Sequence, residues 1–573
     1  QGTVNTNGKD FAVGGEAIES GTSTITQNGV DVATAHWDFD DVLSFNADAA
    51  GTGGTFDLVY RLLSVDVKDG QTFTLSSDAG GEQDFTALIT GSGGLTVDAP
   101  GSGCTVELGN AATEEKNSYT GATTVTSGTT VVLVEDDAMG QTSSLDTVGD
   151  VMLNDGVHQT VGGLTGTGEI TLGDNSVFTL AQSGDATISN TLAGNGTFAV
   201  SGTDTTNVEF ETDFDFSGHL DFTNANFNLA SGQNQGVAEN AHVTIGSGSA
   251  LYLGEGGSTV GSLTIASEDA KLDAVPLVIG SADAALSMDG TLTLQTNATV
   301  ALKSISVQDD LSLVDYDQGS HSQDLISTGG ISGSGTLQVT APTGMQLDSV
   351  TVAYEQNGTK VADTTWTVTE ALTPAGNNMQ IGAELTAINI TGDLVLSGSG
   401  TEGSPDVLSA AVTDSDTGSL IFEPAQTGGN AYFRVEGAKD YDVETTVRTG
   451  ATVSIGTSGF GTTSLLTIDN GGSVILRDNA AQTVGGLAGS GGLTVGGGAT
   501  FIANALAGNG TFVVDLGSSA NALSFTNTAS TFAGTLQVTN ALLDYDRTSN
   551  MESVLDGVVV DLGEGAVYHL NEN

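Results

Sequence analysis

The amino-acid sequence predicts an all-β fold, a parallel β-helix in which short strands stack as the turns of a solenoid. Apolar and polar residues alternate over short runs, as in Glu169–Leu172, Thr197–Val200 and Thr511–Val514, and Gly, Asn or Asp closes each run. Apolar stripes at helical spacing do not persist anywhere along the chain. These two observations favour many short strands over helices.

A repeated phrase adds the third observation. It consists of an apolar residue, a Gly-x-Gly corner and an alternating strand, and its copies begin at Gly163, Thr191, Gly330, Gly486 and Ala505. Two longer identities, Gln159–Leu164 with Gln482–Leu487 and Leu192–Phe198 with Leu506–Phe512, indicate a duplicated block of turns. Units too small to bury their own apolar face must stack, and about 22 residues per turn predicts roughly 25 turns.

The domain organisation follows from where this pattern holds and where it fails. We expect an N-terminal cap and early turns with loops over residues 1–115, a β-helix over 116–342, a β-helix with a projecting hairpin and loop insertions over 343–440, and C-terminal turns over 441–573. A string of β-sandwich domains is the main alternative. Sandwiches favour longer strands, more aromatic residues and repeats of domain size.

Charge and composition exclude several classes of partner. Twelve Lys and Arg stand against seventy Asp and Glu, giving a formal net charge of −58. Such a chain has no basic surface for a phosphate backbone, so we expect no nucleic-acid partner. The single cysteine, Cys104, cannot form an intramolecular disulfide. The fold must therefore be held by burial alone.

One segment carries a family resemblance. Residues Asn117–Leu133 read Asn-Ser-Tyr-Thr-Gly-Ala-Thr-Thr-Val-Thr-Ser-Gly-Thr-Thr-Val-Val-Leu. The segment resembles the passenger-associated repeat of bacterial autotransporters, whose usual form is N-x-Y-x-G-x-T-x-V-x-x-G-x-L-x-L. Phe214–Leu220 and Thr531–Val538 keep only its F/Y-x-G core.

The resemblance implies a right-handed parallel β-helical passenger domain. Such a domain is exported through the periplasm and outer membrane of a Gram-negative bacterium, and a C-terminal translocator barrel, absent from this sequence, anchors it at the cell surface. The nearest group is the AIDA-type adhesins and self-associating autotransporters. These mediate cell aggregation, biofilm formation and attachment to host matrix proteins or glycans, so the implied partners are another copy of the chain on a neighbouring cell and host matrix proteins or glycans.

The scarce cations are the first candidate ligand-binding residues. Four of the twelve lie close together in the sequence: Arg434, Lys439, Arg448 and Arg477. On successive turns they could form a local positive patch that holds a sulfated or carboxylated glycan through guanidinium contacts. The alternative is ordinary ion pairing with neighbouring acidic residues such as Glu436.

The second candidates are two aromatic residues on a predicted hairpin. Val350–Tyr354 and Lys360–Trp366 alternate on either side of an Asn357-Gly358 turn. If this hairpin projects from the rod, Tyr354 and Trp366 are suitable contact anchors. The alternative is that the hairpin packs onto the rod.

Signals for enzymatic chemistry are weak, and we predict no enzyme and no cofactor. The G-D-S-G-S motif of serine-protease autotransporters is absent, and the six histidines lack metal-ligand spacing. Close carboxylate pairs such as Asp414 and Asp416 are equally suited to acid–base catalysis, to calcium binding and to a solvated acidic surface. A polysaccharide-processing enzyme and an adhesin specific for a matrix protein or glycosaminoglycan therefore remain alternatives to a self-associating adhesin.

Overall fold

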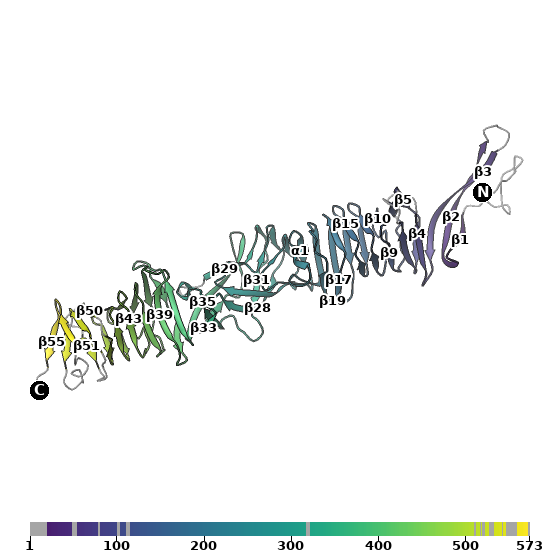
Figure 1. The fold of residues 1–573 in the computed structure, drawn as a ribbon. Coiled ribbons are helices and arrows are strands. Elements are labelled where there is room, and N and C mark those ends of the chain that lie inside the picture. Colours follow the sequence, from purple (N-terminus) through teal and green to yellow (C-terminus); the bar gives the residue numbers. More distant parts are fainter. Residues whose placement is uncertain are drawn as a thin grey trace.

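The computed structural model shows a long rod with the first and last described strands, β1 (Ser20–Gln27) and β55 (Val567–Leu570), at opposite tips (Figure 1). It describes residues 20–47, 54–77, 81–99, 104–109, 115–316, 321–508, 511–515, 517, 522–525, 532–540, 542–545 and 558–570. The rod is a parallel β-solenoid of about 20 turns, which confirms the predicted fold class. Helix in the described ranges is confined to α1 (Asn234–Ala238) and the 3₁₀ helix η1 (Leu313–Tyr316), and no helix there meets the requirements for a membrane span.

An antiparallel sheet forms the N-terminal tip of the described rod. It contains β1 (Ser20–Gln27), β2 (Val30–Ala47) and β3 (Gly54–Val67), and β3 pairs in parallel with β6 (Leu88–Gly91). Asn28 and Gly29 both have positive φ and close the β1–β2 hairpin. The sheet thus leads the chain from antiparallel pairing into the stacked turns.

The first block of turns is built from parallel stacks. One contains β4 (Thr72–Ser76), β7 (Gly94–Asp98), β9 (Thr123–Val125), β11 (Leu145–Thr147) and β14 (Leu164–Gly166). A second contains β5 (Gly81–Phe85), β8 (Cys104–Leu108), β10 (Thr130–Leu133), β12 (Asp150–Leu153), β15 (Glu169–Leu172) and β18 (Thr191–Gly194). A large third sheet contains β13 (His158–Val161), β16 (Val177–Leu180), β17 (Ala186–Ile188), β19 (Thr197–Phe210), β20 (His219–Asn228), β21 (His242–Ile245), β22 (Ala250–Tyr252), β24 (Ser262–Ile265), β25 (Lys271–Ile279), β27 (Thr291–Leu294), β28 (Ala298–Val307), β30 (Gly330–Gly333) and β31 (Leu337–Thr340).

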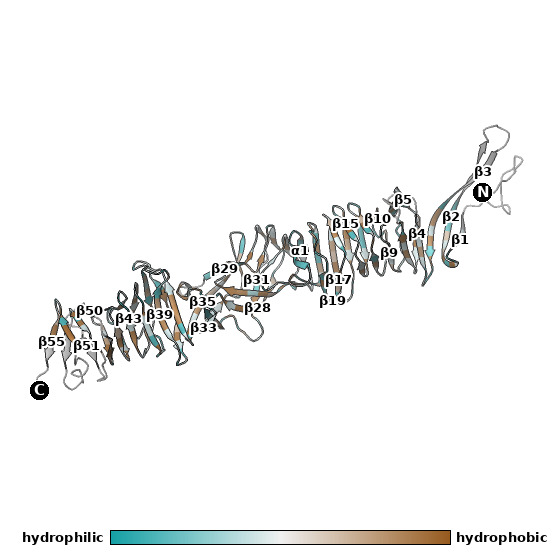
Figure 2. Ribbon diagram, in the orientation of Figure 1, coloured by the Kyte–Doolittle hydropathy of each residue, from teal (hydrophilic) through white to brown (hydrophobic). Residues whose placement is uncertain are grey.

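The alternating pattern of the sequence explains why these strands stack. Val131 pairs with Val151, and Val151 pairs with Ile170, so successive turns are 20 and 19 residues long. All three side chains are buried, whereas Asp150 and Glu169 on the same strands are exposed. Apolar and polar residues accordingly alternate along the strands in Figure 2. Each turn adds one rung to an inner apolar ladder and one to an outer polar ladder.

The Gly-x-Gly corners have a steric cause. Gly166, Gly194 and Gly489 have φ of 97°, 89° and 103°. A Cβ atom at any of the three would lie 2.0 Å from a carbonyl oxygen of the turn before. Only glycine allows the corner to approach the preceding turn so closely, so the repeated phrase is a requirement of stacking.

A mixed sheet with an antiparallel centre interrupts the rod in its middle. It contains β23 (Ser258–Thr259), β26 (Leu286–Ser287), β29 (His321–Ser327), β32 (Val350–Gln356), β33 (Thr359–Val368), β34 (Thr373–Ala375), β35 (Asn378–Ile390) and β38 (Ala411–Asp414). β29, β33 and β34 run antiparallel to β35, and β32 runs antiparallel to β33. The pairs β23–β26, β26–β29 and β35–β38 are parallel. The sheet joins two blocks of parallel turns.

The predicted hairpin exists as β32 and β33, but the expectation that it projects as a free arm is wrong. Its inner face is buried. The side chain of Gln356, beside the Asn357-Gly358 turn, donates to the carbonyl oxygen of Val395 at 2.7 Å and accepts from the Val395 N–H at 2.9 Å. The apolar face of an alternating hairpin gains more from covering the core than from exposure.

The second block repeats the three-stack arrangement. The first stack is β36 (Asp393–Gly398), β39 (Ser419–Pro424), β41 (Glu444–Val447), β43 (Leu466–Ile468), β46 (Leu487–Gly489) and β49 (Leu506–Ala507). The second is β37 (Asp406–Leu408), β40 (Ala431–Val435), β42 (Ala451–Ile455), β44 (Ser473–Leu476), β47 (Gly492–Val495), β50 (Thr511–Asp515), β52 (Thr535–Thr539) and β54 (Val559–Leu562). The third is β45 (Ala481–Val484), β48 (Thr500–Ala503), β51 (Ala522–Phe525), β53 (Leu542–Tyr545) and β55 (Val567–Leu570).

A continuous apolar core runs from Val32 to Val538. Aromatic rings stack along it, as Phe178 and Phe198 do on adjacent turns with ring centroids 5.8 Å apart. The turns number about 20, fewer than the roughly 25 expected from a uniform repeat. The two antiparallel regions use residues without adding turns, and the turn from Leu292 to Ile331 takes 39 residues.

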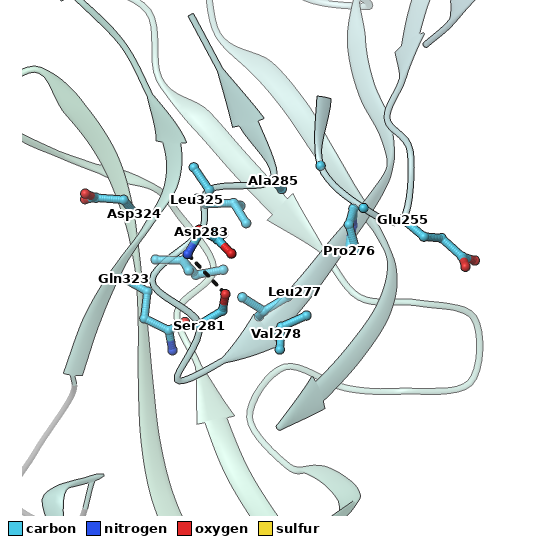
Figure 3. Close-up of a pocket in the computed structure, with 14 residues that line it drawn as sticks. Glu255, Pro276, Leu277, Val278, Ser281, Asp283, Ala285, Gln323, Asp324 and Leu325 are labelled. Carbon is cyan, nitrogen blue, oxygen red and sulfur yellow. Dashed lines mark hydrogen bonds between the residues drawn. The ribbon is translucent and has the colours of Figure 1, made fainter. Parts of the chain in front are cut away.

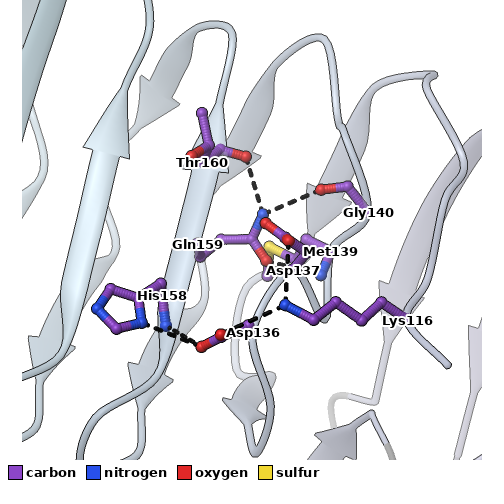
Figure 4. Close-up of polar contacts among 8 residues, drawn as sticks. All are labelled: Lys116, Asp136, Asp137, Met139, Gly140, His158, Gln159 and Thr160. Carbon is purple, nitrogen blue, oxygen red and sulfur yellow. Dashed lines mark hydrogen bonds and ion pairs between the residues drawn. The ribbon is translucent and has the colours of Figure 1, made fainter. Parts of the chain in front are cut away.

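The segment that resembles the passenger-associated repeat contributes buried polar side chains to this core. The Tyr119 hydroxyl lies 2.7 Å from Thr123 Oγ1, which donates to Thr142 Oγ1 at 2.9 Å. In the next turn Gln159 accepts from the Met139 N–H and donates to the carbonyl oxygens of Gly140 and Thr160 (Figure 4). These side chains satisfy backbone groups at corners where strand pairing is interrupted.

Candidate functional site

The predicted positive patch is neutralised by a shared carboxylate. Arg434 Nε lies 2.8 Å from Glu436 Oε1, and Arg477 Nη1 lies 3.2 Å from the same oxygen. Arg477 also donates to the Val435 carbonyl oxygen at 2.9 Å. The structure thus brings Arg434 and Arg477 together, but around Glu436 instead of around an open anion site.

The other two cations of the predicted patch are occupied separately. Arg448 Nη1 lies 3.6 Å from Asp469 Oδ2. Lys439 is buried, and its ammonium group donates to the carbonyl oxygens of Ser409, Ala410 and Glu436 at 3.2, 2.7 and 2.7 Å. Lys439 therefore serves the core, and a ligand has no access to it.

Tyr354 and Trp366 are also core residues. Both are fully buried, the Tyr354 hydroxyl donates to the Leu311 carbonyl oxygen at 2.6 Å, and burial raises the pKa of Tyr354 to about 12. Trp366 donates to Thr364 Oγ1 at 2.9 Å and packs edge-on against Tyr316. The expectation that they are exposed contact anchors is wrong, because the hairpin faces inward.

Acidic side chains gather at two places in the described ranges: Glu82, Asp84 and Glu107, and Asp414, Asp416 and Asp442. In the first group the pKa of Glu107 is raised. The larger cause is a side-chain hydrogen bond with Glu82, and the smaller cause is partial burial. In the second, Asp414 already accepts backbone N–H groups of Asp416, Asp442 and Val443. Oxygen donors of this kind suit calcium, but acidic groups are so abundant on this chain that neither cluster is assigned to a metal.

A cleft lies beside the antiparallel interruption of the rod. It has a volume of about 230 Å³ and lies between the end of β25, the turns at 255–257 and 281–285, the middle of β29 and Ile381 of β35 (Figure 3). Leu277, Leu325 and Ile381 give it an apolar floor. A neighbouring hollow of about 400 Å³ shares five lining residues with it: Gly256, Gly257, Asp283, Ala284 and Asp324.

Three carboxylate residues line the cleft, and two of them are held by other groups of the chain. Asp324 accepts hydrogen bonds from Asn378 Nδ2 at 2.7 Å and from Gln380 Nε2 at 2.9 Å. Glu255 Oε1 lies 2.7 Å from Lys303 Nζ, and this hydrogen bond lowers the pKa of Glu255. Asp283 is exposed at the end of the turn that follows β25. In Figure 3 the side chains of Asp324 and Glu255 point away from the cleft, so these two carboxylates serve contacts within the chain.

Gln323 also lines the cleft and is 8% exposed, and its Nε2 atom has no hydrogen-bond partner. An unpartnered buried amide costs stability. The nitrogen itself has no accessible surface, so it does not open into the cleft.

The sequence gives no local signal for this cleft. Its lining comes from four separated segments, and Gln323 faces Ile381 only because β29 runs antiparallel to β35.

Comparison with known proteins adds no assignment: no family model, curated protein or solved structure matches the chain.

Proposed function

We propose that this chain is a bacterial surface adhesin, a rod that mediates cell aggregation and attachment to other surfaces, as the resemblance to autotransporter passenger domains implies. The observation that carries the proposal is the continuous core of about 20 turns. Each turn repeats the same kind of polar outer surface. A long, rigid element with a repeated exterior suits many weak contacts whose strengths add through avidity.

The outer ladders supply the contacts in this proposal. Thr165 donates to Asp146 on the preceding turn at 3.2 Å, and Asn195 donates to Asp174 on the preceding turn at 3.3 Å. These exposed groups retain further hydrogen-bonding capacity that a second rod can use. A net charge of −58 opposes close approach of two rods, so aggregation should strengthen when salt screens the repulsion.

Attachment through a glycosaminoglycan is the weaker alternative. Arg434, Arg448 and Arg477 are all ion-paired, and Lys439 is buried. Binding of heparin would have to displace these carboxylates against the overall negative field. We therefore expect the purified chain to bind heparin weakly or not at all at physiological salt, as measured by retention on immobilised heparin.

Cell-surface display tests the proposal. The chain is displayed on a non-aggregating host, and settling and adhesion to panels of matrix proteins and glycans are measured at low and moderate salt. Settling or adhesion above that of cells displaying an unrelated β-helix supports the adhesin. Behaviour identical to that control under all conditions contradicts it.

A polysaccharide-processing enzyme on the same fold is tested with the purified chain. Release of reducing ends or unsaturated products from a glycan panel would replace the adhesin proposal with an enzymatic function. We expect no product from any glycan in the panel.

A further inference from the structure

We propose that the apolar face of a ribbon at the N-terminal tip binds the same face of a second copy of the chain, so that two rods join tip to tip. The N-terminal ribbon consists of residues 39–47 of β2 and 54–62 of β3. The inference deepens the proposed function and rests on it, because it adds one specific contact between rods to the weak contacts of the outer ladders.

The ribbon has two strands among the described residues. β1 pairs with β2 no further than Asp38, and β6 pairs with β3 over residues 64–67. Beyond these points β2 and β3 pair with each other alone among the described strands, and Figure 1 shows them at the tip of the rod, extending past β1. A two-stranded ribbon is only marginally stable in water unless something packs on its apolar face.

One face of the ribbon and its base is apolar. The register of β2 and β3 places four apolar pairs opposite one another: Trp37–Leu62, Phe39–Tyr60, Leu43–Leu58 and Phe45–Phe56. Their members on β3 are every second residue, so they lie on one face. The rings of Trp37 and Tyr60 accordingly meet edge to face, with centroids 5.5 Å apart. Polar pairs such as Asn46–Thr55 occupy the alternate positions, on the other face.

This apolar face continues the core of the rod. On β2, Trp37 is two residues from Ala35, which is fully buried and pairs with the buried Val65. Leu62 is partly buried and packs against the core. Farther out, Tyr60 is 62% exposed. The core-facing side of the sheet therefore runs beyond the stacked turns, and solvent reaches it at Tyr60.

The distribution of charge explains why a second copy can approach here. The net charge of −58 opposes contact between two rods, but the four register pairs of the apolar face contain no charged residue. Asp40 and Asp41 lie in the irregular stretch between Phe39 and Leu43, outside the register. Two acidic chains can thus touch through apolar groups, and pairing should strengthen when salt screens the remaining repulsion.

The area of the face matches what a stable pair needs. Beyond its base the ribbon face carries four aromatic residues and two leucines. At about 150 Å² for each aromatic side chain, the face brings on the order of 700 Å² per copy, and a stable interface buries about 800 Å² per partner. Two identical faces form a symmetric contact in which each copy covers the other. Such a contact would join rods whose opposite ends are anchored on different cells.

Three variants separate the apolar face from the other face. Tyr60→Asp places a carboxylate within the apolar face, where pairing would bury it. Thr55→Asp adds the same charge to the same strand on the other face, opposite Asn46, and is the matched control. Tyr60→Phe keeps the ring and removes only the hydroxyl.

Sedimentation of the purified full chain at micromolar concentrations measures the association. We expect the parent chain to sediment as pairs at moderate salt. Tyr60→Asp should weaken pairing at least about tenfold, whereas Thr55→Asp and Tyr60→Phe should pair like the parent. Electron microscopy of chains labelled through a C-terminal tag should show two rods in line, with a label at each outer end.

Four results would overturn the inference. The parent chain stays monomeric, as it would if the chain covered this face itself; the rods join side by side; they join at the end that carries β55; or Tyr60→Asp and Thr55→Asp weaken pairing equally. The first three are read from the parent chain, so they hold even if Tyr60→Asp disturbs the ribbon. Displayed cells can settle through the outer ladders when the tips do not pair, which separates this test from that of the proposed function.

Discussion

The blocks at residues 117–164 and 439–487 place the same buried polar groups in the same relation. Tyr119, Thr123 and Thr142 in the first correspond to Tyr441, Thr445 and Thr463 in the second, and the second chain of hydroxyls has distances of 3.0 and 3.1 Å. Gln159 corresponds to Gln482, which accepts from the Phe460 N–H and donates to the carbonyl oxygens of Gly461 and Thr483. Two sequence segments more than three hundred residues apart thus build one arrangement.

The two blocks differ where the arrangement meets other parts of the chain. Asn117 accepts from the Ile89 N–H and donates to the Ala138 carbonyl oxygen, whereas Lys439 at the corresponding position donates to three carbonyl oxygens. Asp136 accepts from the His158 N–H, and Thr457 does the same for Ala481.

The difference shows what the fold constrains. The buried Tyr, Thr and Gln side chains recur because their partners are equivalent in both blocks, whereas the buried position of Asn117 and Lys439 differs because its partners differ. An acceptor at the surface can be a carboxylate or a hydroxyl, since solvent satisfies whatever remains. Charge can therefore vary between the blocks while the hydroxyl and glutamine contacts stay the same.

The largest expected effect comes from Lys439. Lys439→Met leaves one buried and two partly buried carbonyl oxygens without their donor and should destabilise the second block by about 3 kcal/mol. Asn117→Ala should cost the first block less, about 2 kcal/mol, because two backbone groups lose their partner. Amide hydrogen exchange of each block in the same chain measures both values, and a harmless Lys439→Met would show that the buried ammonium is not structural.

The paired glutamines should behave alike. Gln159→Leu and Gln482→Leu each leave one N–H and two carbonyl oxygens short of a partner, and each should destabilise its own block by about 2 kcal/mol. The measurement is again hydrogen exchange, with the unmodified block of each variant as the internal control. Unequal losses, or loss of protection spread along the whole rod, would contradict local and equivalent roles.

The buried tyrosines predict an alkaline limit to stability. Burial raises the pKa of both Tyr119 and Tyr441 above the ordinary value of 10.0. As the pH passes 10, these two tyrosines ionise in the unfolded chain before they ionise in the folded chain. The stability that the buried hydroxyls contribute is therefore complete below pH 10 and falls above it. Tyr119→Phe and Tyr441→Phe should each cost about 1 kcal/mol at pH 7.

Urea denaturation between pH 7 and 11 checks the sign of this effect. The two Phe variants should lose less stability over that range than the parent chain does. A parent chain whose stability does not change above pH 10 would show that the two hydroxyls ionise freely.

The smallest effect is expected at Asp136. The backbone hydrogen bond from His158 lowers the pKa of this carboxyl, although partial burial opposes the shift. The stability that the ionised Asp136 carboxylate contributes is therefore present above about pH 4 and is lost as the pH falls. Because Asp136 and Lys116 are both substantially exposed, Asp136→Asn should cost only about 0.5 kcal/mol at pH 7.

Urea denaturation at pH 7 and pH 3 measures the effect at Asp136. The difference in stability between the variant and the parent should be smaller at pH 3 than at pH 7, because the contribution of a carboxyl with a lowered pKa is lost as the pH falls. Thr457→Ala in the other block is the uncharged comparison and should show no such decrease.

Local patterns were sufficient to predict the fold but not the site. Alternation and the Gly-x-Gly corners predicted the stacked turns, because each turn depends on residues close in sequence. The pairing of Arg477 with Glu436 joins residues 41 apart, and the cleft depends on β29 lying against β35. The inward face of Tyr354 and Trp366 could not be predicted either, since an alternating hairpin has one apolar face whether it packs or projects.

The most direct test of the central claim mixes two differently labelled populations of cells, one displaying this chain and one displaying an unrelated β-helix. Microscopy at moderate salt measures which cells enter aggregates or attach to a polysaccharide-coated surface. The adhesin account predicts that cells displaying this chain are enriched in aggregates or on the surface, and that soluble chain competes with them. Equal distribution of both populations, with no effect of soluble chain, would contradict it.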